Sequence, residues 1–144
     1  MTTTDTTTSQ PPAAASPPPD PTTPRAGGPR VALGPRGEQH AAHWLRDIGY
    51  EILDRNWRSG REGEIDIIAR DGDCLVFVEV KTRAGTRHGT PFEAIDDRKR
   101  RRLRRLIGRW LQQRETAWPG PVRLDAIGVR LLTDGLVIEH RRGV

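Results

Sequence analysis

The sequence has only two lysines, a single cysteine and no long apolar run. The lone cysteine, Cys74, excludes an internal disulfide and a cysteine-based zinc site. No stretch is long or apolar enough to span a membrane. The first residues also lack the basic start and apolar segment of a signal peptide. These absences together predict a cytoplasmic protein.

Large apolar side chains are almost missing from the first thirty residues, which are rich in proline, threonine and alanine. Such a segment cannot bury enough surface to offset the entropy lost on ordering. We therefore expect a disordered Pro/Thr-rich tail over residues 1–30 and one domain over 31–144, an ordinary length for a single domain.

Acidic residues are outnumbered by basic ones, 19 against 24, which gives a net charge of +5. The charges within the tail cancel, so residues 31–144 carry the whole excess. A basic domain favours a polyanionic partner, nucleic acid before an anionic membrane. Lysine is a compact charge whose pKa can shift, unlike that of arginine. The only two lysines, Lys81 and Lys99, are therefore candidates for specific roles.

The apolar pattern predicts a helix, three strands, a second helix and two further strands. Amphipathic spacing indicates helices at 37–49 and 96–115. Alternating or apolar runs indicate strands at 50–58, 64–70, 74–83, 122–132 and 136–140. This order fits an α/β fold with one central mixed sheet and helices against its faces. The second helix can form a crossover that places strand 122–132 parallel to an earlier strand.

Residues 63–83, GEIDIIARDGDCLVFVEVKTR, predict a hairpin with charged side chains on one face. Alternation of side chains in a strand gives this face Glu64, Asp66 and Ile68 from one strand and Leu75, Phe77, Glu79 and Lys81 from the other. A tight turn at 71–74 would place Asp66 opposite Glu79 and Glu64 opposite Lys81. The other face is uniformly apolar and is expected to be core: Ile65, Ile67, Val76, Val78 and Val80.

Opposed carboxylates repel each other unless a cation lies between them. A hard divalent cation such as Mg²⁺ prefers carboxylate and water oxygens, and it can activate water and polarise a phosphoryl oxygen. The pattern therefore favours metal-dependent phosphodiester hydrolysis, with Asp66 and Glu79 as metal ligands and catalytic residues. Lys81 would orient the attacking water and stabilise charge. The alternative is an exposed ladder of ion pairs, which antiparallel sheets often carry.

Two further acids have open roles. Glu38 lies on the inward stripe of the first predicted helix and could be another metal ligand, or it could simply stabilise the first turn of that helix. Glu64 has two candidate partners, Lys81 and a nearby arginine, and its role stays unassigned.

These residues resemble the Asp…(Asp/Glu)-x-Lys nuclease superfamily, through "ID" followed by "EVK". More closely, "NWR…GEIDIIARD…VFVEVKTR" resembles the bacterial YraN family, small endonuclease-like proteins related to archaeal Holliday-junction resolvases. The resemblance covers the chain from about Gly37 to its end. It implies a restriction-endonuclease-like α/β/α core and a site for Mg²⁺ or Mn²⁺. In that site Asp66, Glu79 and Lys81 take the superfamily's two acids and lysine, and Glu38 takes the helical acid of resolvase-like members.

Arginine is concentrated on the outer face of the second predicted helix, at Arg98, Arg101, Arg102, Arg105 and Arg109. A run of one sign repels itself, so we expect phosphate contacts here rather than only a solvated face. Arg83, beside the glycine-rich stretch 84–91, and Arg87, within it, are further candidates. Lys99 instead extends the inward apolar stripe. It points either toward the sheet edge and the substrate backbone, or back to solvent as a snorkelling lysine.

Two other patterns are expected to be structural. His40 and His43 lack the additional His or Cys ligands that a zinc site needs, and Asp125 is expected to form a salt bridge with Arg123.

The sequence thus predicts a metal-dependent nuclease whose partner is DNA rather than RNA, with branched or structured DNA as candidate substrates. The alternative is a nucleic-acid-binding adaptor that has the same fold but no turnover. A homodimer is expected only by analogy with resolvases that cut two strands.

Overall fold

The computed structural model describes residues 32–85 and 89–144. Its elements are α1 (Leu33–Asp47), β1 (Glu51–Arg58), β2 (Glu64–Asp71), β3 (Cys74–Ala84), a short 3-10 helix η1 (Pro91–Ala94), α2 (Asp97–Gln112), β4 (Val122–Leu132) and β5 (Gly135–Arg141). The predicted order of helices and strands is confirmed, and η1 is an addition that the sequence pattern did not predict. The predicted tail, residues 1–30, and the candidate phosphate ligand Arg87 lie outside the described residues.

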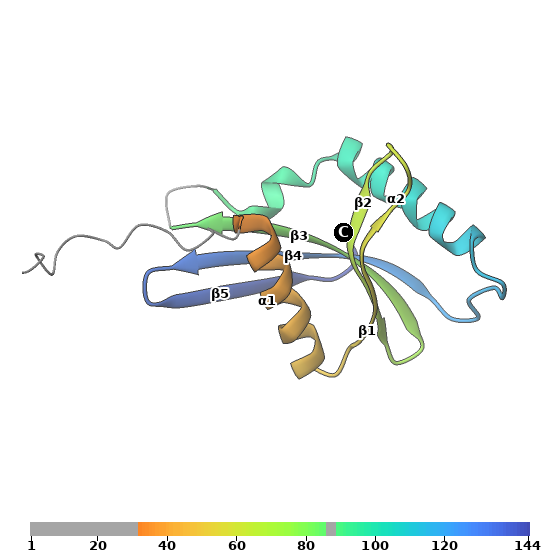
Figure 1. Cartoon of the computed structure of the whole chain (residues 1–144), viewed down its shortest axis with the longest axis horizontal. Helices are drawn as coiled ribbons and strands as arrows, with labels where there is room; N and C mark the ends of the chain where they lie inside the picture. The colour runs from red at the N-terminus through yellow and green to blue at the C-terminus, as the bar shows by residue number, and fades with distance from the viewer. Residues whose placement is uncertain (1–31, 86–88) are drawn as a thin grey trace, which may run out of the picture. The chain divides into compact units, whose positions relative to one another are not determined.

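The five strands form one mixed sheet in the order β1-β2-β3-β4-β5. Neighbouring strands are antiparallel, except that β3 and β4 are parallel and are joined by the crossover through α2. The predicted crossover is therefore confirmed. Helices α1 and α2 pack against opposite faces of the sheet (Figure 1), so the expected α/β/α core with a central mixed sheet is confirmed as well.

Two apolar clusters join the sheet to the helices. The cluster on the α1 side contains Ala41, Ala42, Leu45, Tyr50, Ile67, Ala69, Val76, Val78, Val80, Ile127 and Val129. The cluster on the α2 side contains Ile65, Ile68, Leu75, Phe77, Leu103, Leu106, Ile107 and Leu124. The central strands β2, β3 and β4 contribute to both clusters. Because both of their faces are buried, their sequences are nearly continuous apolar runs.

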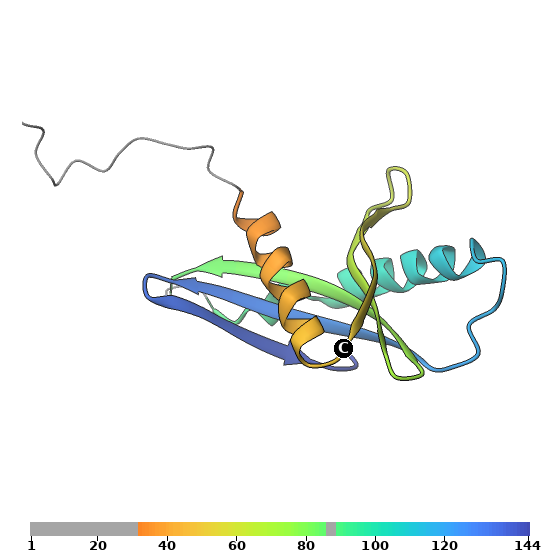
Figure 2. The same cartoon turned by 60° about the horizontal axis from the view of Figure 1, so that its bottom comes forward.

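The sheet forks where β2 leaves β3. Pairing between these strands ends at Ile67 and Val78, whereas β2 stays paired with β1 as far as Arg58 and Glu64. Strand β3 continues instead beside β4. Figure 2 shows the β1–β2 hairpin rising away from the layer of β3, β4 and β5. The prediction that Glu64 lies opposite Lys81 is therefore wrong, because β2 and β3 have separated before they reach these residues.

The prediction that Ile65 shares a face with Ile67 is also wrong. Ile67 packs in the cluster on the α1 side, and Ile65 packs in the cluster on the α2 side. Residues two apart in a regular strand point the same way, so β2 turns between them, at Asp66. Across the β1–β2 pair, at the level of Asp66, Asn56 has a φ of 53° and is the one non-glycine residue of the described chain with a positive φ.

Helix α1 begins at Leu33, four residues before the predicted start. Pro35 does not prevent this, because a proline in the first turn of a helix removes no intrahelical hydrogen bond. The helix ends in a Schellman motif. Gly49, with a φ of 96°, donates its N–H to the carbonyl of Arg46, and Tyr50 donates to the carbonyl of Leu45.

Helix α2 begins at an aspartate cap. The side chain of Asp96 accepts a hydrogen bond of 2.7 Å from the backbone N–H of Lys99, which is the usual geometry of an N-terminal cap. The cap fixes the first turn of the helix, which carries Lys99. None of the helices in the described segments combines the length and the apolar character that crossing a membrane needs.

Candidate active site at the fork of the sheet

Asp66 lies at the point where β2 and β3 separate. Its side chain accepts a hydrogen bond of 2.7 Å from the backbone N–H of Val80, two residues beyond the last β2–β3 pair, Ile67 and Val78. Only 6% of the residue is exposed. Burial, and then repulsion from Glu79, raise the pKa of Asp66 to about 7, although the hydrogen bond from Val80 opposes the shift. A buried carboxylate with a pKa near neutrality is typical of functional sites.

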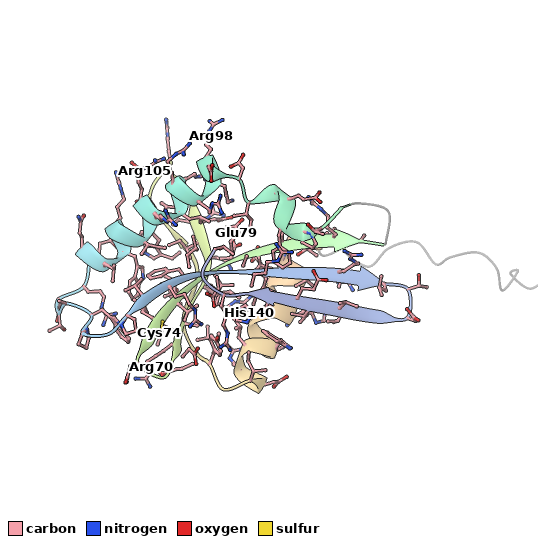
Figure 3. The ribbon with its side chains drawn as sticks, turned by 180° about the vertical axis from the view of Figure 1, so that it is seen from behind. Arg70, Cys74, Glu79, Arg98, Arg105 and His140 are labelled. Carbon is pink, nitrogen blue, oxygen red and sulfur yellow. The ribbon has the colours of Figure 1, made fainter. Side chains whose placement is uncertain are left out.

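Glu79 is the second acid of the fork, on the α2 side of β3. Its side chain is 9% exposed, and one of its carboxylate oxygens, Oε1, lies 2.8 Å from the ammonium Nζ of Lys99. Figure 3 shows Glu79 on the inner side of α2. The predicted neighbourhood of Asp66 and Glu79 is confirmed, since Glu79 is among the charges that raise the pKa of Asp66.

Glu38 reaches the same region from α1. The helix approaches β3 very closely at the preceding residue, where a Cβ on Gly37 would lie 1.8 Å from the hydroxyl oxygen of Thr82. Burial, and then repulsion from Glu64 and Glu79, raise the pKa of Glu38. Because α1 starts at Leu33, Glu38 is not in its first turn. The first-turn alternative is thereby excluded.

Lys81 follows Glu79 by two residues, so both side chains project from the α2 side of β3. Its partner in β4 is Gly128, against which Pro91 of η1 packs so closely that a Cβ at residue 128 would lie 2.8 Å from the proline ring. Lys81 is half-buried and forms no ion pair with any acid in the described segments. Arg83, two residues further on, is half-buried and continues the same row.

Glu64 is bound by an arginine, as one of the two predicted alternatives proposed. Its Oε2 lies 3.0 Å from Nε of Arg58, the residue directly across the β1–β2 pair. This half-exposed pair belongs to the hairpin and not to the acid pair at the fork.

The donor atoms of the fork suit a hard divalent cation. Asp66 and Glu79 offer carboxylate oxygens in a buried, mutually repelling arrangement, and Mg²⁺ is commonly held by one or two carboxylates together with water and substrate phosphates. Within residues 32–85 and 89–144, no three His, Cys, Asp or Glu side chains lie close enough to share one metal ion. Glu38 therefore contributes charge to the site, without forming a three-acid ligand set with the other two.

The arginines of α2 fall into three groups. Arg102 donates a hydrogen bond of 2.8 Å from Nε to the carbonyl of Glu62, and Arg109 forms an ion pair of 2.5 Å with the carboxylate of the same residue. These two arginines fasten the tip of the β1–β2 hairpin to α2. Arg100 is paired with Asp97 in the first turn of the helix. The remaining arginines are exposed without an ion pair to any described acid: Arg98, Arg101, Arg104 and Arg105. Arg98 and Arg105 project away from the sheet in Figure 3.

A separate buried polar cluster lies on the α1 side. Asp125 is fully buried and accepts hydrogen bonds from Arg123 (2.7 and 3.0 Å) and from the backbone N–H of Gly143 (3.0 Å), and it lies 2.8 Å from Nε2 of His140. Arg123 also donates to the hydroxyl of Tyr50. The predicted structural salt bridge between Asp125 and Arg123 is confirmed, and it is part of a larger network.

Two features of the site were not predicted from the sequence. The first is the direct contact of Lys99 with Glu79, which links the start of α2 to β3. The second is Asn56, which lowers the pKa of Glu38 against the effect of burial and whose backbone is left-handed across the strand pair from Asp66. Asparagine tolerates positive φ better than most residues and is rare in strands. An asparagine inside a strand pattern was therefore the available signal.

Comparison with known proteins identifies the family. A family model described as "Uncharacterised protein family UPF0102" matches residues 37–129, which include every residue of the fork. The chain belongs to the UPF0102 family. UPF0102 is the endonuclease-like YraN group, so the resemblance seen in the sequence is confirmed. A UPF0102 protein of Streptomyces coelicolor is 53% identical over 80% of this chain and 89% of its own length. A UPF0102 protein of Leifsonia xyli is 58% identical over 67% of this chain and 80% of its own length.

Among solved structures, Pyrococcus furiosus SfsA in complex with Ca²⁺ matches 83% of this chain and 74% of its own, with 18% identity and a TM-score of 0.36. This similarity is too low to inform the function. The family description and the names of the two relatives specify no activity either. What the fork does must therefore be argued from its own residues.

Proposed function

We propose that this UPF0102 protein is a metal-dependent nuclease that hydrolyses phosphodiester bonds in DNA. The observation that carries the proposal is the acid pair at the fork. Asp66 is buried beside Glu79, and its pKa is raised to about 7, first by burial and then by that repulsion. A structural ion pair has no need of this arrangement, whereas a pair of carboxylates that would hold a divalent cation does.

Each residue of the fork has a distinct task in this proposal. Asp66 and Glu79 would hold a Mg²⁺ or Mn²⁺ ion, which supplies Lewis acidity and lowers the pKa of bound water when it is present. Asp66 is held in position by the N–H of Val80. Lys81, on the same face of β3 as Glu79, would orient the attacking water and stabilise the phosphate charge. Glu38 adds negative charge that strengthens cation binding.

The basic outer face of α2 supports nucleic acid as the partner. Arg98, Arg101 and Arg105 are exposed and spaced three and four residues apart, so they lie along one side of the helix. None of the three forms an ion pair with an acid in the described structure. Phosphate groups are the natural ligands of such a row.

Removal of two of these arginines is expected to weaken DNA binding and flatten its salt dependence. Each lost phosphate contact lowers the slope of log K against log salt by about 0.9 for duplex DNA. The double variant Arg98→Gln/Arg105→Gln should therefore show a slope smaller by roughly 1.8 in fluorescence anisotropy titrations. Arg36→Gln/Arg46→Gln removes two exposed arginines of α1 and serves as the matched control. Equal slopes for both double variants would show that α2 does not contact the DNA.

One observation favours a second candidate, a nucleic-acid-binding adaptor without turnover. Lys99 already neutralises Glu79, and among the described side chains no three acids share a metal position. A protein that kept the fold for binding alone could be stabilised in this way. The enzyme remains our proposal, because Asp66, Glu79 and Lys81 are all present and the raised pKa of Asp66 has no structural benefit.

A cleavage assay separates the two candidates. The full chain is incubated with Mg²⁺ or Mn²⁺ and a panel of duplex, single-stranded and four-way-junction DNA, with RNA alongside. Asp66→Ala is expected to lose roughly a thousandfold or more in rate, and Lys81→Ala at least roughly a hundredfold. Cleavage by the wild type at the same rate as both variants would reveal a contaminating nuclease. Binding of DNA without cleavage of any substrate would establish the adaptor, and faster cleavage of RNA would replace DNA as the substrate.

A further inference from the structure

Lys99 holds an unusual place among the basic residues of α2. The arginines of the helix face solvent, Asp97 or the hairpin tip, whereas the ammonium of Lys99 lies 2.8 Å from the buried carboxylate of Glu79. It is also among the charges that lower the pKa of Asp66, so it acts on both acids of the fork. The ammonium therefore occupies the part of the site where a positive charge is most favourable.

We propose that Lys99 is the exchangeable cation of the fork, which a divalent metal ion displaces from Glu79 and which then binds a phosphate of the nucleic-acid strand. This inference rests on the proposed metal site of Asp66 and Glu79. It differs from that proposal in assigning Lys99 two successive ligands, a carboxylate before the metal binds and a phosphate afterwards.

The first argument is that the two cations exclude each other. An ammonium and a divalent ion that share one carboxylate lie a few ångströms apart, and like charges at that distance repel strongly where the dielectric constant is low. The Glu79 side chain is 9% exposed, so solvent screens the repulsion poorly. The same burial explains why Lys99 stays in place before the metal arrives, since an unpaired carboxylate is costly in such a position.

The second argument is that the Lys99 ammonium can move to a position in solvent. Its side chain is 32% exposed, so the ammonium can leave Glu79 through solvent without unfolding the helix. Its backbone is fixed by the Asp96 cap. The neighbouring residue, Arg98, already points outward from the same turn of α2. A released Lys99 would therefore join the exposed arginines at the edge of the site, where the proposed DNA strand passes.

Metal binding measured by calorimetry tests the competition. The full chain is titrated with Mg²⁺ at alkaline pH, where the carboxylates are ionised. Lys99→Met should bind Mg²⁺ at least about fivefold more tightly than the wild type, because the Lys99 ammonium no longer competes with the metal ion for the Glu79 carboxylate. Arg98→Met is the matched control, because it removes one positive charge from the same turn without a contact to Glu79. An equal gain in Mg²⁺ affinity in both variants would mean that the loss of any positive charge from this turn has the same effect. That result would overturn the inference.

The scarcity of lysine provides a test on the unmodified protein. Selective ¹³C/¹⁵N labelling of lysine yields signals from only Lys81 and Lys99, which Lys81→Arg and Lys99→Arg variants assign. On saturation with Mg²⁺, the Lys99 signal should move to the position of a solvated lysine, and a short DNA strand should then shift it again. Metal binding that leaves the Lys99 signal unchanged would overturn this inference alone. Failure to bind Mg²⁺ at all would overturn the proposed metal site together with it.

Discussion

Replacement of Asp66 by asparagine is expected to make the protein more stable at about pH 8 while abolishing the proposed hydrolysis of DNA. The folded protein raises the pKa of Asp66 from 3.8 to about 7, first through burial and then through repulsion from Glu79. Its contribution to stability is fully present below the unfolded pKa and is lost as the pH rises through the folded pKa. At alkaline pH the ionised side chain of Asp66 therefore lowers the free energy of unfolding by at most roughly 4 kcal/mol.

Urea denaturation at several pH values measures this effect. Asparagine can still accept the hydrogen bond from Val80 but carries no charge, so Asp66→Asn should match the wild type near pH 4 and exceed it by roughly 2–4 kcal/mol near pH 8. Glu64→Gln changes a half-exposed acid in the same strand and should move stability by less than about 1 kcal/mol. A less stable Asp66→Asn at alkaline pH would mean that Asp66 is a structural anion.

Replacement of Asp125 by asparagine should have a large effect of the opposite sign, a loss of roughly 3–5 kcal/mol. Burial alone would raise the pKa of Asp125, but hydrogen bonds from His140, Arg123 and Gly143 lower it overall. The carboxylate therefore stabilises the fold above its unfolded pKa, and that stabilisation is lost as the pH falls through the folded pKa. An uncharged side chain leaves Arg123 without its main counter-charge.

The loss should appear as a lower denaturation midpoint at neutral pH that approaches the wild-type value as the pH falls below about 4. Asp134→Asn, at the exposed turn between β4 and β5, is the matched control and should be close to neutral. A cost below about 1 kcal/mol for Asp125→Asn would show that the network is not a main support of the fold.

The contrast between these aspartates distinguishes the site from the scaffold. Both carboxylates are buried in the sheet. Asp125 has a full set of donors around it, whereas Asp66 has one backbone donor and a like charge beside it. Proteins retain such an uncompensated acid where function requires it.

The strands, the crossover and the meeting of Asp66 with Glu79 could be predicted from the sequence, because they depend on local patterns. Alternation along a strand and a tight turn fix which residues face each other. The fork could not be predicted in this way. The separation of β2 from β3 after Ile67 depends on the competition between two partners, β1 and β4, and on the turn of the chain at Asp66. The errors at Ile65 and Glu64 both follow from that event.

The contacts of long side chains could not be predicted from the sequence either. The helical pattern placed Lys99 on the inward stripe, but the pattern alone could not choose between Glu79 and solvent. The start of α1 was missed because Gly34 and Pro35 are weak helix formers in an interior, yet both are acceptable in a first turn. That earlier start is what moves Glu38 out of the first turn.

The most direct test of the central claim is the rate at which the full chain cleaves DNA in Mg²⁺ at about pH 8, with Asp66→Asn purified and assayed in parallel. The asparagine variant is expected to be the better folded of the two, so unfolding cannot explain a loss of activity. Magnesium-dependent cleavage by the wild type, with a rate lower by roughly a thousandfold in the variant, is the result that we predict. Equal rates for the two proteins, or no cleavage by either under any metal condition, would contradict the assignment of the fork as a hydrolytic site.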